Sequence, residues 1–179
     1  GNDIAFDAII DTAKRVITIN PSSDFSSEQV IYVAIEASVE DSYDNAISTS
    51  SATFTSADSV SPILTFDPQD LENPVPVAEN ITITFSEPIR NTDDSALTST
   101  NVDNLITLKD TDENGSDIGF NATIDSDKKI ITIDSDSNFS SEQTVYVAIG
   151  ATVEDSSDNV ITASSLTFIA AHPTAPNHN

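Results

Sequence analysis

The chain has 179 residues, enough for one or two domains, and carries 30 Asp and Glu against 6 Lys and Arg, a formal net charge of −24. So acidic a chain repels phosphate backbones and anionic lipid, which argues against nucleic acid and membrane surfaces as partners and favours cations. The absence of Cys excludes disulfides, thiolate nucleophiles and Cys-ligated zinc together. No apolar run approaches the roughly 18 residues of a membrane span, so we expect no membrane-spanning segment.

An internal repeat organises the chain. Shifting the sequence by 114 positions aligns residues 1–58 with residues 115–172 without a gap, and about 34 of the 58 pairs are identical. This predicts that residues 1–59 are the back part of one repeat and that residues 60–172 are a complete repeat. Residues 173–179 are then a linker or the start of a third. No signal peptide opens the chain and Gly1 begins in mid-pattern, so we expect a piece of a longer protein.

Taken in chain order, residues 1–59 show four strand patterns, near residues 4–10, 16–19, 31–35 and 52–54. Four strands make only half of a sandwich, which leaves an apolar face and strand edges bare. We therefore expect another chain to supply the missing strands by strand complementation within a fibre, or upstream residues of the same protein to supply them.

The complete repeat shows seven strand patterns. They lie near residues 63–66, 81–85, 105–109, 118–124, 130–134 and 145–149 and around Leu166 and Phe168. One helical turn is expected near Ala96 and Leu97, and Asn114-Gly115 is expected to supply the positive φ angles of a hairpin turn. Short alternating strands separated by frequent turn signals predict an all-β fold, an antiparallel Greek-key sandwich of the Ig-like kind.

Three motifs carry a resemblance to a known family: FSEPI at residues 85–89, VYVAIGATVEDSSDN at residues 145–159 and SSLTF at residues 164–168. Together they resemble the bacterial Ig-like domains of S-layer proteins and large surface adhesins. The resemblance implies a secreted or cell-surface spacer or adhesive stalk whose partners are neighbouring copies of the same repeat or chain. Asp158-Asn159 stands where the family usually has Gly-Asn, and Asp tolerates left-handed backbone angles better than most residues.

An acidic cluster is expected at one pole of the complete repeat. In an Ig-like sandwich, the loop after the second strand and the loop between the last two strands lie at the same pole, where the preceding linker also arrives. Glu87 sits on the first loop, Asp155 and Asp158 sit on the second, and Asp58 sits in the linker. Oxygen ligands from several loops suit calcium, which takes six to eight of them. A solvated acidic loop is an equally good interpretation.

A second acidic stretch, DTDENG at residues 110–115, matches the first half of an EF-hand calcium loop. The twelfth position of such a loop would be Asn121, where a bidentate Glu is needed, and no flanking helices are predicted. We therefore expect a plain hairpin turn.

Catalysis is not indicated. The two histidines, His172 and His178, both fall in the linker-like tail, so no His-centred triad or zinc site is expected in the body of the chain. The sequence thus predicts a non-catalytic structural or adhesive module, at a bacterial surface or outside the cell, with calcium as a possible stiffening ion. The alternative is a domain that binds carbohydrate or a receptor, which an exposed aromatic cluster would favour.

Overall fold

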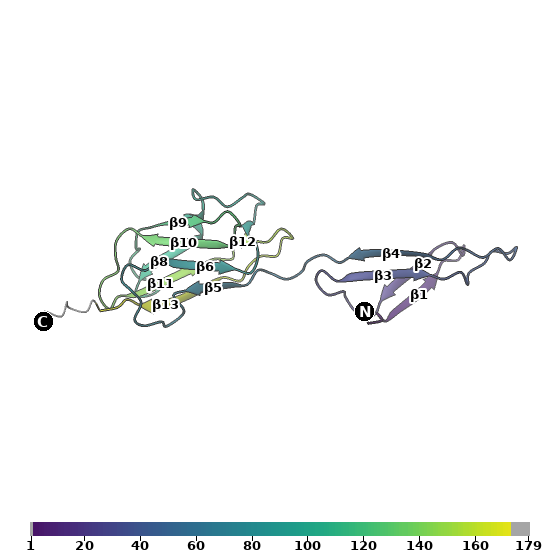
Figure 1. Ribbon diagram of the computed structural model, residues 1–179, viewed down its shortest axis with the longest axis horizontal. Coiled ribbons are helices and arrows are strands. Elements are labelled where there is room, and N and C mark those ends of the chain that lie inside the picture. The colour runs from purple at the N-terminus through teal and green to yellow at the C-terminus, as the bar shows by residue number, and fades with distance from the viewer. Residues whose placement is uncertain (1, 173–179) are drawn as a thin grey trace. The chain divides into compact units, whose positions relative to one another are not determined.

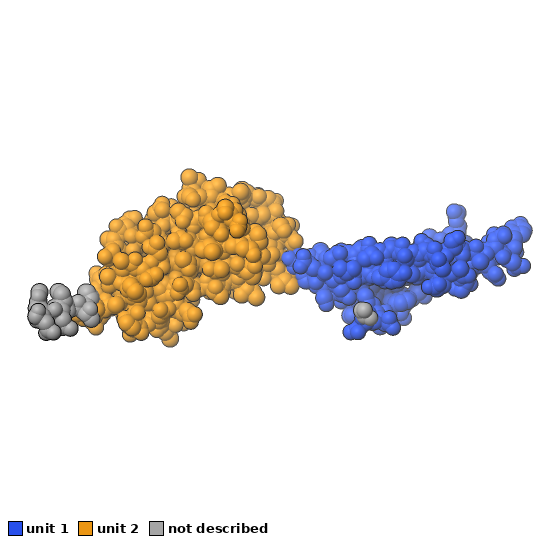
Figure 2. Space-filling model, viewed as in Figure 1, with its two compact units in different colours: residues 1–59 blue, residues 60–179 orange. Residues whose placement is uncertain are grey.

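The computed structural model describes residues 2–172. Its internal contacts divide the chain into two units, residues 1–59 and residues 60–179 (Figure 2). The predicted linker or third repeat, residues 173–179, lies outside the described residues.

The second unit is built almost entirely from strands (Figure 1). These are β5 (Leu64–Asp67), β6 (Ile81–Phe85), β7 (Arg90–Asn91), β8 (Ile106–Asp110), β9 (Phe120–Ile124), β10 (Ile130–Ser135), β11 (Thr144–Ile149), β12 (Val153–Glu154) and β13 (Ser164–Ile169). A single turn of 3₁₀ helix, η1 (Val102–Leu105), precedes β8. Within residues 2–172, no helix is long and apolar enough to cross a membrane.

The strands form two main sheets. One has the order β5-β6-β10-β9, the other has the order β13-β11-β8, and every pairing in them is antiparallel. The chain crosses from the first sheet to the second at β8 and returns to the first sheet at β9, so the connections are of the Greek-key type. This is the four-plus-three strand order of an immunoglobulin constant-type sandwich, so the predicted fold class is confirmed.

Alternation along the strands explains the core. In β6, Ile81, Ile83 and Phe85 are buried whereas Thr84 between them is exposed. In β11, Val145, Val147 and Ile149 are likewise buried. Because successive side chains of a strand point to opposite faces, each sheet contributes one aliphatic face to a shared interior.

Residues 71–75, which follow β5, lie beside the last segment of the second unit, residues 167–171. The amides of Leu71 and Val75 donate to the carbonyls of Thr167 and Ile169, at 2.7 and 3.0 Å, and the Ala171 amide donates to the carbonyl of Val75. Val75 and Ala170 form a parallel bridge. The segment that follows β5 is therefore hydrogen-bonded to the strand by which the chain leaves the unit.

The first unit consists of two separate hairpin-like pairs. Strand β1 (Phe6–Ile10) pairs with β2 (Ile17–Pro21), and β3 (Val30–Ile35) pairs with β4 (Ser50–Thr55). Each strand lies 114 residues before a strand of the second unit with the same partner and register. The four predicted strands are present, and they do not form a closed sandwich.

Two local predictions were wrong. The helical turn expected near Ala96 and Leu97 is absent there, and the helix that does form starts at Val102. Leu97 is nevertheless fully buried, as a core residue on an irregular segment. In the turn after β8, Gly115 does not have a positive φ; Thr111 has one, of 71°. Gly115 is needed for space instead, because a Cβ there would lie 1.5 Å from the main-chain oxygen of Asp110.

Candidate metal centre at one end of the second unit

Two loops meet at one end of the second unit. The short strand β7 pairs with β12, with Arg90 opposite Glu154. The chain also enters the unit here, since the Ser86 amide donates to the carbonyl of Ile63 at 2.8 Å. The structure thus brings together the loop after the second core strand and the loop before the last one, as the topology predicts.

Asp155 organises its own loop. Its Oδ1 accepts hydrogen bonds from the amides of Ser157 and Asn159, at 2.7 and 3.0 Å, and its Oδ2 accepts one from Asn159 Nδ2 at 2.9 Å. Burial alone would raise the pKa of Asp155, but these hydrogen bonds and the nearby Arg90 charge outweigh it and hold the pKa below its ordinary value of 3.8. The turn needs Asp158 at a φ of 68°, which confirms that Asp supplies the left-handed residue here.

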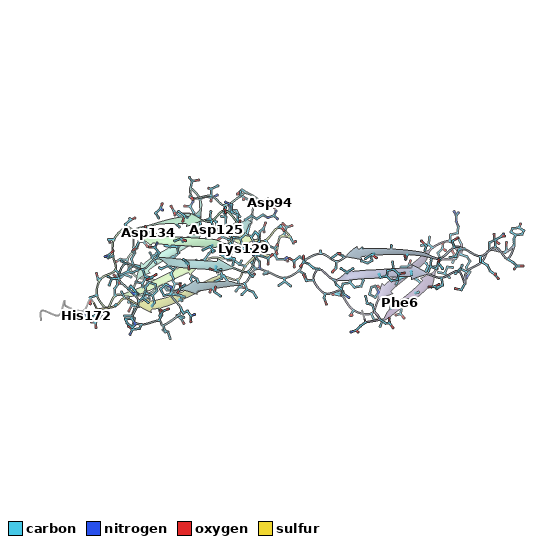
Figure 3. The ribbon with its side chains drawn as sticks, in the orientation of Figure 1. Phe6, Asp94, Asp125, Lys129, Asp134 and His172 are labelled. Carbon is cyan, nitrogen blue, oxygen red and sulfur yellow. The ribbon has the colours of Figure 1, made fainter. Side chains whose placement is uncertain are left out.

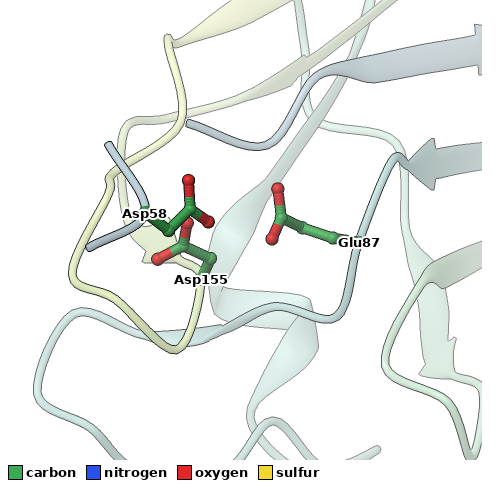
Figure 4. Close-up of side chains that lie close together, drawn as sticks. All are labelled: Asp58, Glu87 and Asp155. Carbon is green, nitrogen blue, oxygen red and sulfur yellow. The ribbon is translucent and has the colours of Figure 1, made fainter. Parts of the chain in front are cut away.

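Glu87 and Asp155 bring two carboxylates close together at this end of the unit (Figure 4). A carboxylate oxygen of Glu87 lies within 4.8 Å of one of Asp155. Asp155 is buried and Glu87 is half-buried. A carboxylate has about four lone-pair positions, so accepting hydrogen bonds from the loop and coordinating a cation are compatible roles for Asp155.

Asp158, a predicted ligand, belongs to a different group. Its carboxylate is ion-paired with Arg90, which also contacts Glu154, with Nε 3.2 Å from Oε1, and Asp94, with Nη2 2.7 Å from Oδ1. Glu154 is buried and therefore depends on this cation for compensation. The Arg90 guanidinium offsets one of the three carboxylate charges and contacts all three side chains, so it already takes the place that a metal ion would need, which makes this group a poor place for calcium.

Sequence reasoning missed Arg90. The available signal was its position directly after the FSEPI motif, as one of six basic residues in an acidic chain. A second cationic side chain lies beside the loop that holds Glu87, since Lys129 Nζ donates to the carbonyl of Ser86 at 3.0 Å. Figure 3 shows Asp94 at this end of the unit and His172 at the other.

Asp58 belongs to the first unit. Its Oδ1 accepts a hydrogen bond of 2.6 Å from Ser27 Oγ, and the hydroxyl of Ser27 in turn accepts a hydrogen bond from the Ser59 amide. Its role as a ligand beside Glu87 and Asp155 stays a prediction.

The turn at residues 110–115 is a plain turn. The Asp110 amide donates to the carbonyl of Ser116, and Asp112 Oδ1 accepts from the Asn114 amide at 2.8 Å. Lys109 beside it pairs with Asp117 at 3.1 Å. Asp112 thus caps its own turn, as the hairpin interpretation predicts.

Two pockets lie in the described part of the chain, one in each unit. One in the second unit, of about 290 Å³, is lined by residues without titratable side chains: Ser61, Pro62, Ile63, Leu64, Thr162, Ala163 and Ser164. One in the first unit, of about 420 Å³, is polar and includes Asp3 and Asp24. Neither of these two pockets is lined by a histidine, lysine or cysteine. His172 lies at the end of the described chain, and His178 lies outside it.

The second unit therefore has the strand order, core and loop arrangement of an immunoglobulin-like sandwich. A family model for the bacterial Ig-like domain matches residues 58–169, more than half of the chain, and the chain belongs to that family. No curated protein matches the chain. Domains of this family occur in bacterial surface proteins and are generally non-catalytic binding or structural modules.

Proposed function

We propose that this chain is a non-catalytic structural module of a bacterial surface or secreted protein, in which Ig-like units serve as load-bearing spacers. One observation carries the proposal: in the second unit the chain enters at the end that holds Ser86 and leaves by β13 at the opposite end (Figure 1). A module with its two ends at opposite poles adds length to a stalk or fibre.

The hydrogen bonds between the first and last segments support this role. Residues 71–75 and 167–171 run parallel and are joined by several main-chain bonds. Tension applied at the two ends pulls these segments past each other, so the bonds carry the load together instead of opening one after another. Thr167 is tied further, since its amide donates to Asp70 Oδ1 at 3.1 Å.

Hydrogen exchange of the full chain tests this role. If the terminal segments belong to the load-bearing core, the amides of Val75, Ile169 and Ala171 exchange only when the whole unit unfolds, as slowly as those of β6 and β11. The exposed loop at residues 92–95 provides the fast reference. Exchange of the three amides at the loop rate would mean that the ends fray, and would contradict a load-bearing role.

We further propose that calcium binds Glu87 and Asp155, with Asp58 as a third ligand. Two unit charges about 4 Å apart repel by roughly 1 kcal/mol in water and 4 kcal/mol at a protein surface, and a cation between them reverses this term. Asp58 precedes Ile63 by five residues, a span of up to about 17 Å, and Ile63 is hydrogen-bonded to Ser86 beside Glu87. Asp158 was also predicted as a calcium ligand. Because it is ion-paired with Arg90, it is the poorest candidate ligand of the four predicted residues.

Calorimetric titration with calcium tests the site, with Glu87→Gln and Asp58→Asn as the informative variants. A dissociation constant of roughly 10⁻⁴–10⁻³ M is expected, as in other extracellular modules, and it should weaken in both variants. Asp134→Asn is the matched control, because Asp134 is an exposed residue of β10 placed away from the pair (Figure 3). Equal affinity for calcium in all three variants, or no heat of calcium binding in any protein, would contradict the site and leave Glu87 and Asp155 as solvated acidic surface.

The alternative function, binding of carbohydrate or a receptor, depends on exposed aromatic side chains. Tyr32 and Tyr43 of the first unit are well exposed. The Phe25 and Phe54 rings, however, meet edge to face at 5.9 Å, as Phe139 and Phe168 do in the core of the second unit at 5.6 Å. Because the second unit buries the equivalent pair, we propose that the Phe25 and Phe54 rings serve packing and not ligand binding, and we keep the spacer as the proposed function.

A further inference from the structure

Four Asn-x-Ser/Thr triplets, the acceptor sequence for N-linked glycans, occur in the chain, and all of them lie in the second unit. They begin at Asn80, Asn114, Asn121 and Asn138. Because Asn, Ser and Thr are common in this chain, the triplets alone do not indicate a modification. The structure, however, separates one of the four from the other three.

Three of the triplets are anchored in the core by their middle residue. Ile81, Ala122 and Phe139 are 1%, 0% and 5% exposed. The Ala122 amide donates to Asp103 Oδ1 at 2.7 Å, and the Phe139 amide donates to the carbonyl of Val77 at 2.9 Å. Ile81 begins β6, which is paired with a strand on each side. A transferase that draws an acceptor segment into its own active site would have to pull these residues out of the interior or out of the sheet.

The triplet at residues 114–116 has no such anchor. Asn114 and Ser116 are exposed, and the middle residue, Gly115, has no side chain to bury. The hydrogen bonds of this turn are local: the amides of Asn114 and Gly115 donate to Oδ1 and to the carbonyl of Asp112, at 2.8 and 3.0 Å. The segment can therefore bend away from the surface at the cost of a few exposed hydrogen bonds, while the core and both sheets stay intact.

We propose that Asn114 is an N-glycosylation site, modified by an oligosaccharyltransferase whose donor is an oligosaccharide linked to a lipid diphosphate. Asn114 Nδ2 forms a bond to the anomeric carbon of the first sugar, and the bond from that carbon to the diphosphate oxygen breaks. The lipid diphosphate leaves with the electron pair, and the amide loses one proton to a base of the transferase. In the cell, the modification rests on the proposed surface or secreted location, because the chain must meet the transferase outside the cytoplasm.

The modified turn lies at the end of the unit where β13 ends. Asp110, at the base of the turn, pairs with Val145, and the preceding Thr144 pairs with Ile169, the last residue of β13. A glycan on Asn114 therefore sits at the opposite end of the unit from the candidate calcium site, and the two do not interfere. It covers the tip of an exposed turn, the kind of segment at which proteases cut folded proteins.

The test incubates the folded full chain with a purified bacterial oligosaccharyltransferase and a lipid-linked oligosaccharide, and locates the added mass by peptide mapping. One glycan should appear on Asn114, and the other three sites should react at least about tenfold more slowly, because their segments must first open. Asn114→Gln and Ser116→Ala should each abolish the modification, whereas Ser116→Thr keeps the hydroxyl and should preserve it. Asn121→Gln is the matched control, since it removes the exposed asparagine of the next triplet, and it should change nothing.

A synthetic peptide of residues 108–118 in the same reaction separates the sequence from its setting in the fold. Modification of the peptide but not of the folded chain would overturn the proposal, because the turn would then be inaccessible. So would no modification of either, with the enzyme active on its own acceptor peptide, or preferred modification of Asn80, Asn121 or Asn138 in the folded chain. The purified reaction depends neither on cellular location nor on load, so its failure is distinct from a failure of the spacer role in hydrogen exchange.

Discussion

Arg90 is the only cation that contacts the buried Glu154 carboxylate among the ion pairs of the described residues, so Arg90→Gln tests how the loop end of the second unit is held. The Glu154 side chain is 7% exposed and its Oε1 lies 3.2 Å from Arg90 Nε. Removing one partner of a fully buried pair costs about 3–5 kcal/mol, because an uncompensated charge stays inside. The Arg90 side chain is 26% exposed, so water replaces part of the lost contact and we expect about 2–3 kcal/mol.

Thermal unfolding followed by circular dichroism measures this loss. At about 4 °C per kcal/mol for a unit of this size, Arg90→Gln should lower the melting temperature by roughly 8–12 °C. Lys128→Gln is the charge-matched control within the same unit, and its melting temperature should stay close to that of the unaltered protein. Glu154→Gln added to Arg90→Gln removes the stranded charge and should recover much of the loss, with a coupling free energy of about 1–3 kcal/mol. Additive losses in the double variant, or equal effects of Arg90→Gln and Lys128→Gln, would refute the reasoning.

Three further predictions are each measured by denaturant or thermal unfolding. Phe168→Ala should cost about 3–5 kcal/mol, whereas Phe54→Ala at the equivalent exposed position should leave the transition of the second unit unchanged; equal effects would contradict the assignment of the core. The pKa of Asp155 is lower in the folded protein than its ordinary value of 3.8, so its ionised carboxylate stabilises the fold at pH values above 3.8. This stabilisation is lost as the pH falls from 3.8 through the lowered pKa. Asp155→Asn should therefore lose less stability on acidification than the unaltered chain, and an unchanged acid profile would count against the loop geometry. Gly115→Ala forces a Cβ against a main-chain oxygen and should cost about 1–3 kcal/mol, while Gly150→Ala, with its nearest contact at 3.5 Å, should be nearly neutral.

The sequence predicts the seven core strands because their alternation is strong. Ile81, Ile83 and Phe85 with threonines between them leave little choice of face, and β6 begins and ends where that pattern does. The pole that gathers Glu87 and Asp155 follows from topology, since strand order alone fixes which loops are neighbours.

Structural features that lack a periodic pattern of apolar and polar residues cannot be predicted from the sequence in this way. Val75 stands between Pro74 and Pro76, so nothing in its surroundings indicates that it is fully buried and paired with β13. The two-residue strands β7 and β12 are too short to show alternation. The ion pair between Arg90 and Asp158 joins segments that are more than 60 residues apart in the sequence, and no local sequence pattern indicates it.

Single-molecule pulling on the full chain tests the spacer role most directly. The chain has no native Cys, so tethers can be placed at chosen pairs of positions: Val60→Cys with His172→Cys for end-to-end load, and Val60→Cys with Asp127→Cys for load at one end. The turn at residues 125–128 lies at the same end as Ile63, because the Ile89 amide donates to the carbonyl of Lys128 beside the Ser86 loop. The second pair of tethers therefore peels strands apart bond by bond. A load-bearing spacer predicts a clearly higher unfolding force for the end-to-end pair, and equal or lower force in that geometry would contradict it.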